Sequence, residues 1–390
     1  MRHAHRWLLA ASLAGSLAAL AGCAAGPRTA GPAPPQLFHD ARFGPPGERI
    51  STSEIFALDD AMRRFLAVDI ADQLRSKGKQ TGLIEALYHK AQLRLEYDAA
   101  KTKNAAESFA TRSGNCLSLV VMTAAFAREL KLPVTYQSAF LEETWSRTGN
   151  LLFASSHVNI TVGRRIIDAG TSRDLSPLTI DFLPPEDLRR LRTREIDEAT
   201  VVAMYANNRA AEALADGRLD DAYAWAREAL RHDAGFAGAW NTLGVVYLRH
   251  GDAAEGAAAF EHVLAFEPRN TRALSNLAEA YARQGLGERA AQARERLAAV
   301  EPYPPFHFFN LGQRAMERSD YAAAREYFAR EVERADYYHE FHFWLGLADF
   351  QLGNHAAAKK ELALAMQSST TRHQHDIYAA KLAWLRSRQQ

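Results

Sequence analysis

One spacing dominates the second half of the chain, where similar residues return about every 34 positions. The clearest copy is marked by Trp240, Leu243, Gly244, Tyr247, Phe260 and Pro268. Later copies repeat these positions at Leu274, Leu277, Ala278 and Tyr281, then at Phe308, Leu311 and Gly312, and then at Leu345 and Gly346. Because a unit of this length cannot bury its apolar face alone, we expect neighbouring units to stack.

The repeated pattern resembles the tetratricopeptide repeat. A weaker copy runs from Ala210 to Ala229, and Leu183-Pro184-Pro185 marks a break before it. The resemblance implies an all-α solenoid over residues 184–390, with about five helix pairs stacked in a right-handed array. A terminal helix over Arg372–Arg386 is expected to cover the last repeat.

Aromatic side chains gather on the first helices of the last two repeats. By the repeat pattern, four of these residues and one methionine are expected to line the concave groove: Phe306, Phe309, Met316, Phe343 and Phe350. Earlier repeats offer a more polar set, namely Asn241, Val245, Arg272, Ser275 and Glu279. Such a groove would hold a peptide, a protein partner or the N-terminal domain itself. The alternative is that the aromatic residues pack between repeats or under the terminal helix.

The stretch Ser113–Val121 brings a cysteine to the start of an apolar helix. Gly114 and Asn115 interrupt regular structure, and the following residues are apolar on most sides, which predicts a buried helix. Cys116 then lies at or near the first helical turn, where free N–H groups and the helix dipole favour an anion. A thiolate is the nucleophilic form of cysteine. The alternative is that Cys116 is a small core residue.

The N-terminus has the pattern of a secretory signal in residues 1–22. Basic residues precede the apolar run Trp7–Leu20, which is too short to span a bilayer comfortably. Leu20-Ala21-Gly22-Cys23 resembles the bacterial lipobox, which implies lipidation of Cys23 and, from Ala24, an outer-membrane protein facing the periplasm. Residues 23–47 are rich in Pro, Gly and Ala and are expected to be a tether.

Composition excludes several classes of function. The chain has 2 Cys, so a lipidated Cys23 leaves Cys116 without a disulfide partner and excludes a cysteine-based zinc site. The formal net charge of +1 gives no electrostatic reason to expect nucleic acid binding. The histidines of the repeats show no spacing typical of metal ligands, and no cofactor is expected. An unpaired thiol in an oxidising compartment favours a catalytic Cys116.

Two alternating runs flank Gly163-Arg164, which has the chemistry of a tight hairpin turn. With this turn, Val162 would face Arg165, and Asn159 would face Asp168. His157 and Asp168 would then be diagonal neighbours on one face of the hairpin, within reach of a side-chain hydrogen bond. A carboxylate in that position orients an imidazole and fixes its tautomer. The interpretation depends on the turn, because a slip of one residue would separate the two side chains.

These elements together resemble the transglutaminase-like superfamily, relatives of papain-type cysteine hydrolases. Gly114-Asn115-Cys116, His157 and Asp168 match its motifs in order over about Ile55–Leu183. The resemblance implies an α+β domain over residues 48–183 in which Cys116 is the nucleophile, His157 the base and Asp168 the orienting group. It would attack peptide amides, with water (peptidase or amidase) or an amine (transamidase) as acceptor. The competing hypothesis is a non-catalytic scaffold lipoprotein.

Overall fold

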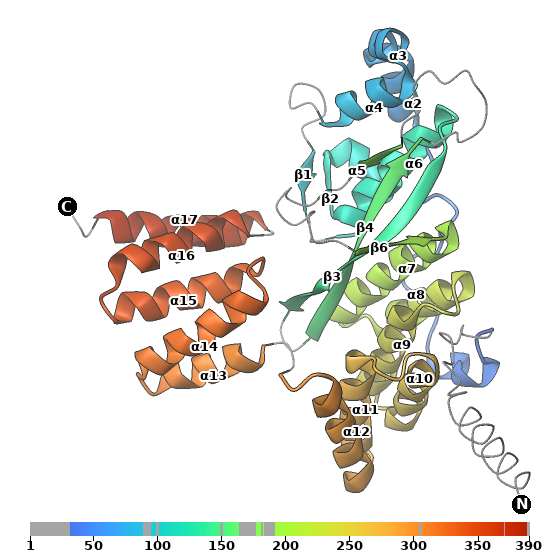
Figure 1. Ribbon diagram of the computed structural model, residues 1–390. Helices are drawn as coiled ribbons and strands as arrows, with labels where there is room; N and C mark the ends of the chain where they lie inside the picture. Colours follow the sequence, from blue (N-terminus) through green and yellow to red (C-terminus); the bar gives the residue numbers. More distant parts are fainter. Residues whose placement is uncertain are drawn as a thin grey trace, which may run out of the picture.

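The computed structural model describes residues 32–88, 95–98, 101–148, 151–163, 177–180, 182, 192–303, 306–369 and 371–387. The described chain is mostly helical, with a small antiparallel sheet in its N-terminal part and stacked helix pairs in its C-terminal part (Figure 1). In these ranges, no helix has both the length and the apolar character that crossing a bilayer requires.

Short helices surround one long buried helix in the N-terminal domain. The short elements are α2 (Asp60–Arg64), the π-helical turn η3 (Phe65–Asp69), α3 (Ala71–Lys77), α4 (Lys79–Tyr88), α5 (Ala105–Thr111) and the strands β1 (Glu96–Tyr97) and β2 (Ser113–Gly114). The long helix is α6 (Cys116–Glu129), and every residue from Cys116 to Ala127 is buried. The predicted buried helix is therefore confirmed, together with its start at the cysteine.

Four strands form one antiparallel sheet in the order β5-β4-β3-β6. They are β3 (Val134–Thr148), β4 (Leu151–Val162), β5 (Leu178–Ile180) and β6 (Arg192–Ile196). Helix α6 packs on β3 and β4, and the Tyr136 hydroxyl on β3 accepts a hydrogen bond of 2.9 Å from Arg128 of α6. Because β6 pairs with β3, the N-terminal domain extends to Ile196, beyond the boundary predicted at residue 183.

The predicted hairpin around Gly163-Arg164 is not the pairing that β4 makes in the described chain, and residues 164–168 lie outside the described part. On one side of β4, Ile160 and Val162 lie opposite Ile180 and Leu178 of β5, and β3 fills the other side. Both edges of β4 are therefore paired over residues 160–162. Gly163 has a φ of 98° and an N–H that donates to the Pro133 carbonyl, and the next described strand of the sheet is β5.

Five helix pairs and a terminal helix follow the sheet in the described chain. The pairs are α7 (Glu198–Ala215) with α8 (Leu219–His232), α9 (Ala237–His250) with α10 (Ala253–Phe266), α11 (Thr271–Arg283) with α12 (Gly287–Val300), α13 (His307–Glu317) with α14 (Tyr321–Arg334), and α15 (His339–Gln351) with α16 (His355–Gln367), followed by α17 (Arg372–Ser387). Close packing within a pair explains the small residue of the pattern, since a Cβ on Gly244 would lie 2.4 Å from the Phe260 ring. The predicted number of pairs and the terminal helix are confirmed.

The array is interrupted between α12 and α13. One hydrophobic core runs from Ile55 to Ala293, and separate clusters begin at Phe306 and Ala358. Figure 1 shows α7–α12 and α13–α17 as two separate stacks. Pro302 cannot continue α12, and Phe306 has a φ of 63°, so the chain changes direction between the two stacks. The structure therefore differs from the single continuous solenoid expected from the repeat spacing.

Residues 32–50 form a strap that lies on the repeats. Its short 3-10 turns are η1 (Pro35–Leu37) and η2 (Asp40–Arg42). Phe43 stacks on Tyr223 with ring centres 4.0 Å apart, and Phe38 stacks on Trp240 at 5.6 Å. The Asp221 carboxylate accepts hydrogen bonds from the Gly47 and Glu48 N–H groups. The predicted tether of residues 23–47 is thus wrong from residue 32 onward, because side chains about 180 positions away hold it.

Candidate functional site

Cys116 is the first residue of α6 and is 7% exposed. The Asn115 side chain caps the helix by accepting hydrogen bonds of 2.9 Å from the N–H and the hydroxyl of Ser118. A Cβ on Gly114 would lie 2.7 Å from the Ser118 Cβ, so only glycine allows the turn to approach the helix this closely. The local sequence therefore fixes the thiol at a helix N-terminus.

Tyr97 is the neighbour that sequence reasoning missed. It lies opposite Gly114 in the parallel pairing of β1 with β2. Burial first, and then the Cys116 thiol and the Asp98 carboxylate, raise the pKa of the Tyr97 hydroxyl. The whole residue is 47% exposed, so part of Tyr97 remains in contact with solvent. The hydroxyl stays protonated at neutral pH and can donate a hydrogen bond near the thiol.

The first repeat helix reaches the loop that supports Cys116. Glu212 of α7 accepts a hydrogen bond of 2.6 Å from the Thr102 N–H, and the Thr102 hydroxyl accepts one of 2.9 Å from Asn115 Nδ2. Burial raises the pKa of Glu212, although its hydrogen bonds with Thr102 oppose the shift. A chain of hydrogen bonds therefore connects the repeats to the cap of α6.

The other predicted catalytic residues are only partly placed. The backbone of His157 lies in β4 opposite Ala139, but its side chain is outside the described part, as are the whole of Asp168 and of Cys23. Strand alternation gives position 157 the parity of Asn159 and places Ile160 on the opposite face of β4. The diagonal placement of Asp168 depended on the Gly163-Arg164 turn, so that geometric argument no longer holds, and the catalytic set remains a prediction.

The predicted aromatic groove is filled by the protein's own side chains. Phe306 and Phe309 are 2% and 0% exposed and pack against Phe341, with Met316 half-buried beside them. Phe343 stacks on Tyr378 of α17 at 5.3 Å, and Phe350 contacts Trp384 of α17 at 5.6 Å. This packing corresponds to the alternative in which the aromatic residues lie between repeats and under the terminal helix.

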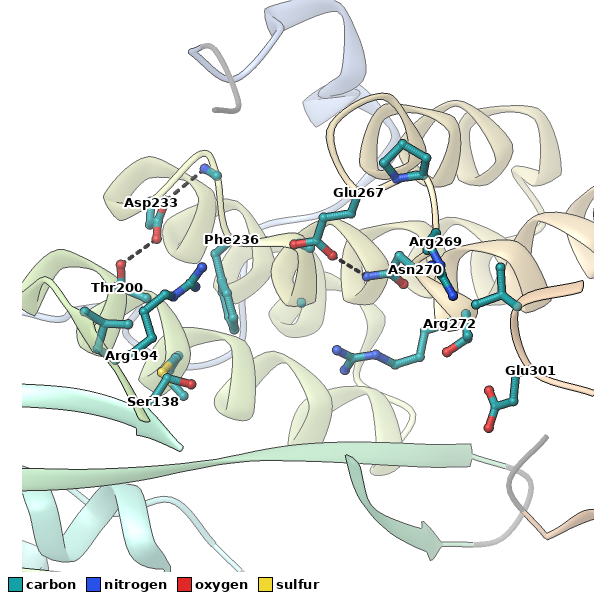
Figure 2. Close-up of a pocket in the computed structure, with 18 of the residues that line it drawn as sticks. Ser138, Arg194, Thr200, Asp233, Phe236, Glu267, Arg269, Asn270, Arg272 and Glu301 are labelled. Carbon is teal, nitrogen blue, oxygen red and sulfur yellow. Dashed lines mark hydrogen bonds between the residues drawn. The ribbon is translucent and has the colours of Figure 1, made fainter. Parts of the chain in front are cut away.

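A pocket of about 1050 Å³ lies between the sheet and the repeats (Figure 2). The sheet contributes Ser138 of β3 and Arg194, Glu195 and Ile196 of β6. The repeats contribute residues at the starts of α9 and α11, from 233–238 and 267–272, then Val300, Glu301 and Phe306 between α12 and α13, and Glu331 and Arg334 of α14. Sequence reasoning missed this pocket because it placed β6 in the repeat domain, although Arg272 was predicted to face the groove.

Most acidic groups of the pocket already have partners. Asp233 accepts hydrogen bonds from Thr200 and the Gly235 N–H, and Glu267 accepts one from Asn270 (Figure 2). Glu331 is 2% exposed and accepts hydrogen bonds from the first N–H groups of α13 and from Arg334. Among the described residues, no three His, Cys, Asp or Glu side chains are arranged to hold a metal ion.

Arg272 differs from these groups. Its side chain extends from the start of α11 toward Phe236 (Figure 2). The Nε atom is buried and, within the described ranges, has no hydrogen-bond acceptor. A buried donor without an acceptor is costly, more so when it belongs to a charged group. The pocket therefore contains a cation whose hydrogen bonding is incomplete.

Comparison with known proteins supports the repeats. A family model described as tetratricopeptide repeat matches residues 241–304 and 309–370, so the C-terminal half contains tetratricopeptide repeats. Similar solved structures include pilF of Pseudomonas aeruginosa, which is 21% identical in sequence. The match covers 49% of this chain and 86% of pilF, with a TM-score of 0.30. A tetratricopeptide repeat protein of Thermus thermophilus is 18% identical, and the match covers 46% of this chain and 99% of that protein, with a TM-score of 0.30. YrrB, described as having an unusual peptide-binding site, has 20% identity, 46% and 92% coverage and a TM-score of 0.25. No curated protein matches the chain.

Proposed function

We propose that the protein binds a peptide or protein partner through its tetratricopeptide repeats. The observation that carries this proposal is the pocket of about 1050 Å³ between the repeats and the sheet. Stacked helix pairs present extended binding surfaces, and a second domain that closes one side of such a surface adds contacts for a bound segment. The partner is therefore expected to touch both the inter-repeat loops and β6.

Site-specific photocrosslinking tests this binding. A benzophenone amino acid replaces Asn270 in the pocket, and a matched variant carries it at Val68, which is 63% exposed on the N-terminal domain. After irradiation in cells, we expect one recurrent adduct from position 270 and none from position 68. Equal adducts from both positions would show that the pocket selects no partner.

A second function is favoured by Cys116 at the start of a buried helix. We propose that the N-terminal domain is a transglutaminase-like, papain-related cysteine hydrolase. His157, oriented by Asp168, takes the proton of the Cys116 thiol, and the resulting thiolate attacks an amide carbonyl. An S–C bond replaces the C–N bond, the amine leaves with the proton from the imidazolium, and water or another amine releases the acyl group.

Thiol labelling separates the enzyme from a scaffold. A chain of residues 32–390 contains Cys116 as its single cysteine, so every alkylated site is that residue. We expect rapid alkylation near neutral pH that slows in His157→Ala, and peptide-amide cleavage or transamidation that disappears in Cys116→Ala. Suppose that Cys116 reacts no faster than a free cysteine in both the folded wild type and folded His157→Ala. The scaffold would then be the correct hypothesis.

We also propose that the chain is a lipoprotein anchored through Cys23 in the outer membrane and facing the periplasm. The Leu20-Ala21-Gly22-Cys23 pattern supports this proposal. Metabolic labelling with an alkyne fatty acid is expected to mark the protein but not Cys23→Ala, and density fractionation is expected to place it with outer-membrane markers. An unlabelled wild type would contradict the anchor.

A further inference from the structure

Strand β6 lies at the edge of the four-stranded sheet. The sheet ends with β6, whose one strand partner is β3 within the described residues. Three β6 residues, Arg194, Glu195 and Ile196, line the pocket, so β6 forms part of its wall. An edge strand presents unpaired N–H and C=O groups that can pair with an added extended segment. With five residues, β6 offers a length of about 17 Å for such pairing.

The positive charge of Arg272 in the pocket indicates which chemical group a bound segment would need. Arg272 Nε is buried without an acceptor, and Arg269 beside it has no ion-pair partner among the described side chains. Arg334 is already engaged with Glu331 and the Tyr303 carbonyl. A carboxylate is the planar acceptor that matches a guanidinium with two parallel hydrogen bonds.

Acidic residues also line the pocket, and they limit where an anion can lie. Asp233, Glu267 and Glu331 are satisfied by internal hydrogen bonds. Glu195 and Asp197 are exposed at the β6 side of the pocket, where they oppose a second negative charge. The arrangement therefore fits a segment with one carboxylate near Arg272 better than a polyanion.

We propose that the pocket binds an extended peptide segment that adds to the outer edge of β6 and places an Asp or Glu carboxylate on Arg272. The proposal rests on the proposed partner binding and specifies its mode. Backbone pairing with β6 supplies affinity, and the ion pair with Arg272 supplies selection. Phe236, half-buried beside Arg272, offers an aromatic surface to a neighbouring apolar side chain.

Paired peptide libraries test the carboxylate. Eight-residue peptides are synthesised in a form with Glu at the fifth position and a matched form with Gln, and binding to residues 32–390 is measured by fluorescence anisotropy. The Glu form of the best-binding peptide is expected to bind roughly tenfold more tightly than its Gln form. Arg272→Gln should remove this preference and Arg272→Lys should retain part of it. Arg294→Gln on α12, exposed and outside the pocket, should leave it unchanged.

Backbone methylation of the same peptide tests the strand pairing. Successive residues of an edge strand point their N–H groups alternately toward and away from their neighbour. N-methylation at odd positions and at even positions should therefore differ by about tenfold in affinity. Equal losses in both series, or a Glu preference that survives in folded Arg272→Gln, would overturn the proposal. So would the absence of any Glu preference across the library. If photocrosslinking at position 270 still captures a partner in that case, partner binding stands and this mode of binding fails.

Discussion

At the scale of single residues, Gly114 controls how closely the turn before α6 approaches the helix. A methyl group there would lie 2.7 Å from the Ser118 Cβ, and Ser118 is held by hydrogen bonds to Asn115 and the Lys103 N–H. Gly114→Ala is therefore expected to lower the free energy of unfolding by about 1–3 kcal/mol. Urea denaturation of the variant and the wild type measures the difference.

Gly287 provides the matched control for this substitution. It is the first residue of α12, and nothing lies within 4 Å of a Cβ built there. Gly287→Ala should be neutral or slightly stabilising, because alanine has the higher helix propensity. If both variants lose the same stability, crowding at Ser118 is not the cause.

The start of α6 was predictable because its signals are local. Asn115 precedes an apolar run, and both the cap and the buried face follow from residues within about one turn of the cysteine. Tyr97 was not predictable in the same way, since its place beside Cys116 depends on β1 pairing with β2. Residue spacing within one segment does not indicate which other strand that segment pairs with.

At the scale of elements, aromatic ring contacts help to hold the strap on the repeats. Phe43 contacts the Tyr223 ring at 4.0 Å and the His250 ring at 4.6 Å. Phe43→Ala is expected to reduce the free energy of unfolding by roughly 1–3 kcal/mol, because the side chain is half-buried rather than fully enclosed. Chemical denaturation measures it, with Arg49→Ala, an exposed residue of the same strap, as control. A change no larger than in the control would mean that the Phe43 contacts add no stability.

The contact between α15 and α17 makes stability depend on pH. His339 is 6% exposed, its Nδ1 lies 2.7 Å from the Tyr378 hydroxyl, and burial lowers the pKa of His339 to about 4. The unfolded chain binds a proton near pH 6.5, so this contribution is complete above that pH and is lost as the pH falls toward 4. The loss would be as much as about 3 kcal/mol.

His342 opposes this trend and has to be separated from it. Burial alone would lower the pKa of His342, but hydrogen bonds to Glu361 and the Asp336 carbonyl outweigh it and raise the pKa. Its contribution is therefore complete below pH 6.5 and declines as the pH rises through the raised value. Urea titrations at pH 7.5 and 4.5 isolate His339: the wild type should lose more stability than His339→Gln. Equal losses would contradict the assignment.

Helices were easier to predict than strands for a physical reason. The repeat pattern records packing between residues close in sequence, so the helix pairs and α17 were found. The sheet depends on which distant segments pair, and Gly163-Arg164 looks like a hairpin turn although β4 pairs with β5 from Leu178. The strap was misjudged similarly, because its composition resembles a linker while its partners lie on α8 and α9.

At the scale of the whole molecule, the hydrophobic core of the described chain is divided into three clusters. The largest core joins the N-terminal domain to the first three helix pairs and ends at Ala293. Beyond it, the cores of α13–α15 and of α16–α17 are separate. The connection is anchored by Arg334, which donates to the Tyr303 carbonyl and lies 3.9 Å from Glu301. These polar contacts are exposed or half-buried and contribute little compared with a shared apolar core.

We therefore expect the two parts to unfold separately. Hydrogen exchange at increasing urea should release α13–α17 first, while α9 and α10, which surround the fully buried Trp240 and Phe260, remain protected. A chain of residues 32–303 should keep its helical circular dichroism and unfold cooperatively, because it retains the whole of the largest core. If all helices instead exchange through one opening, or the shortened chain fails to fold, the stacks are one cooperative unit. The pocket, whose lining includes Phe306 and Glu331, would then connect them energetically as well as spatially.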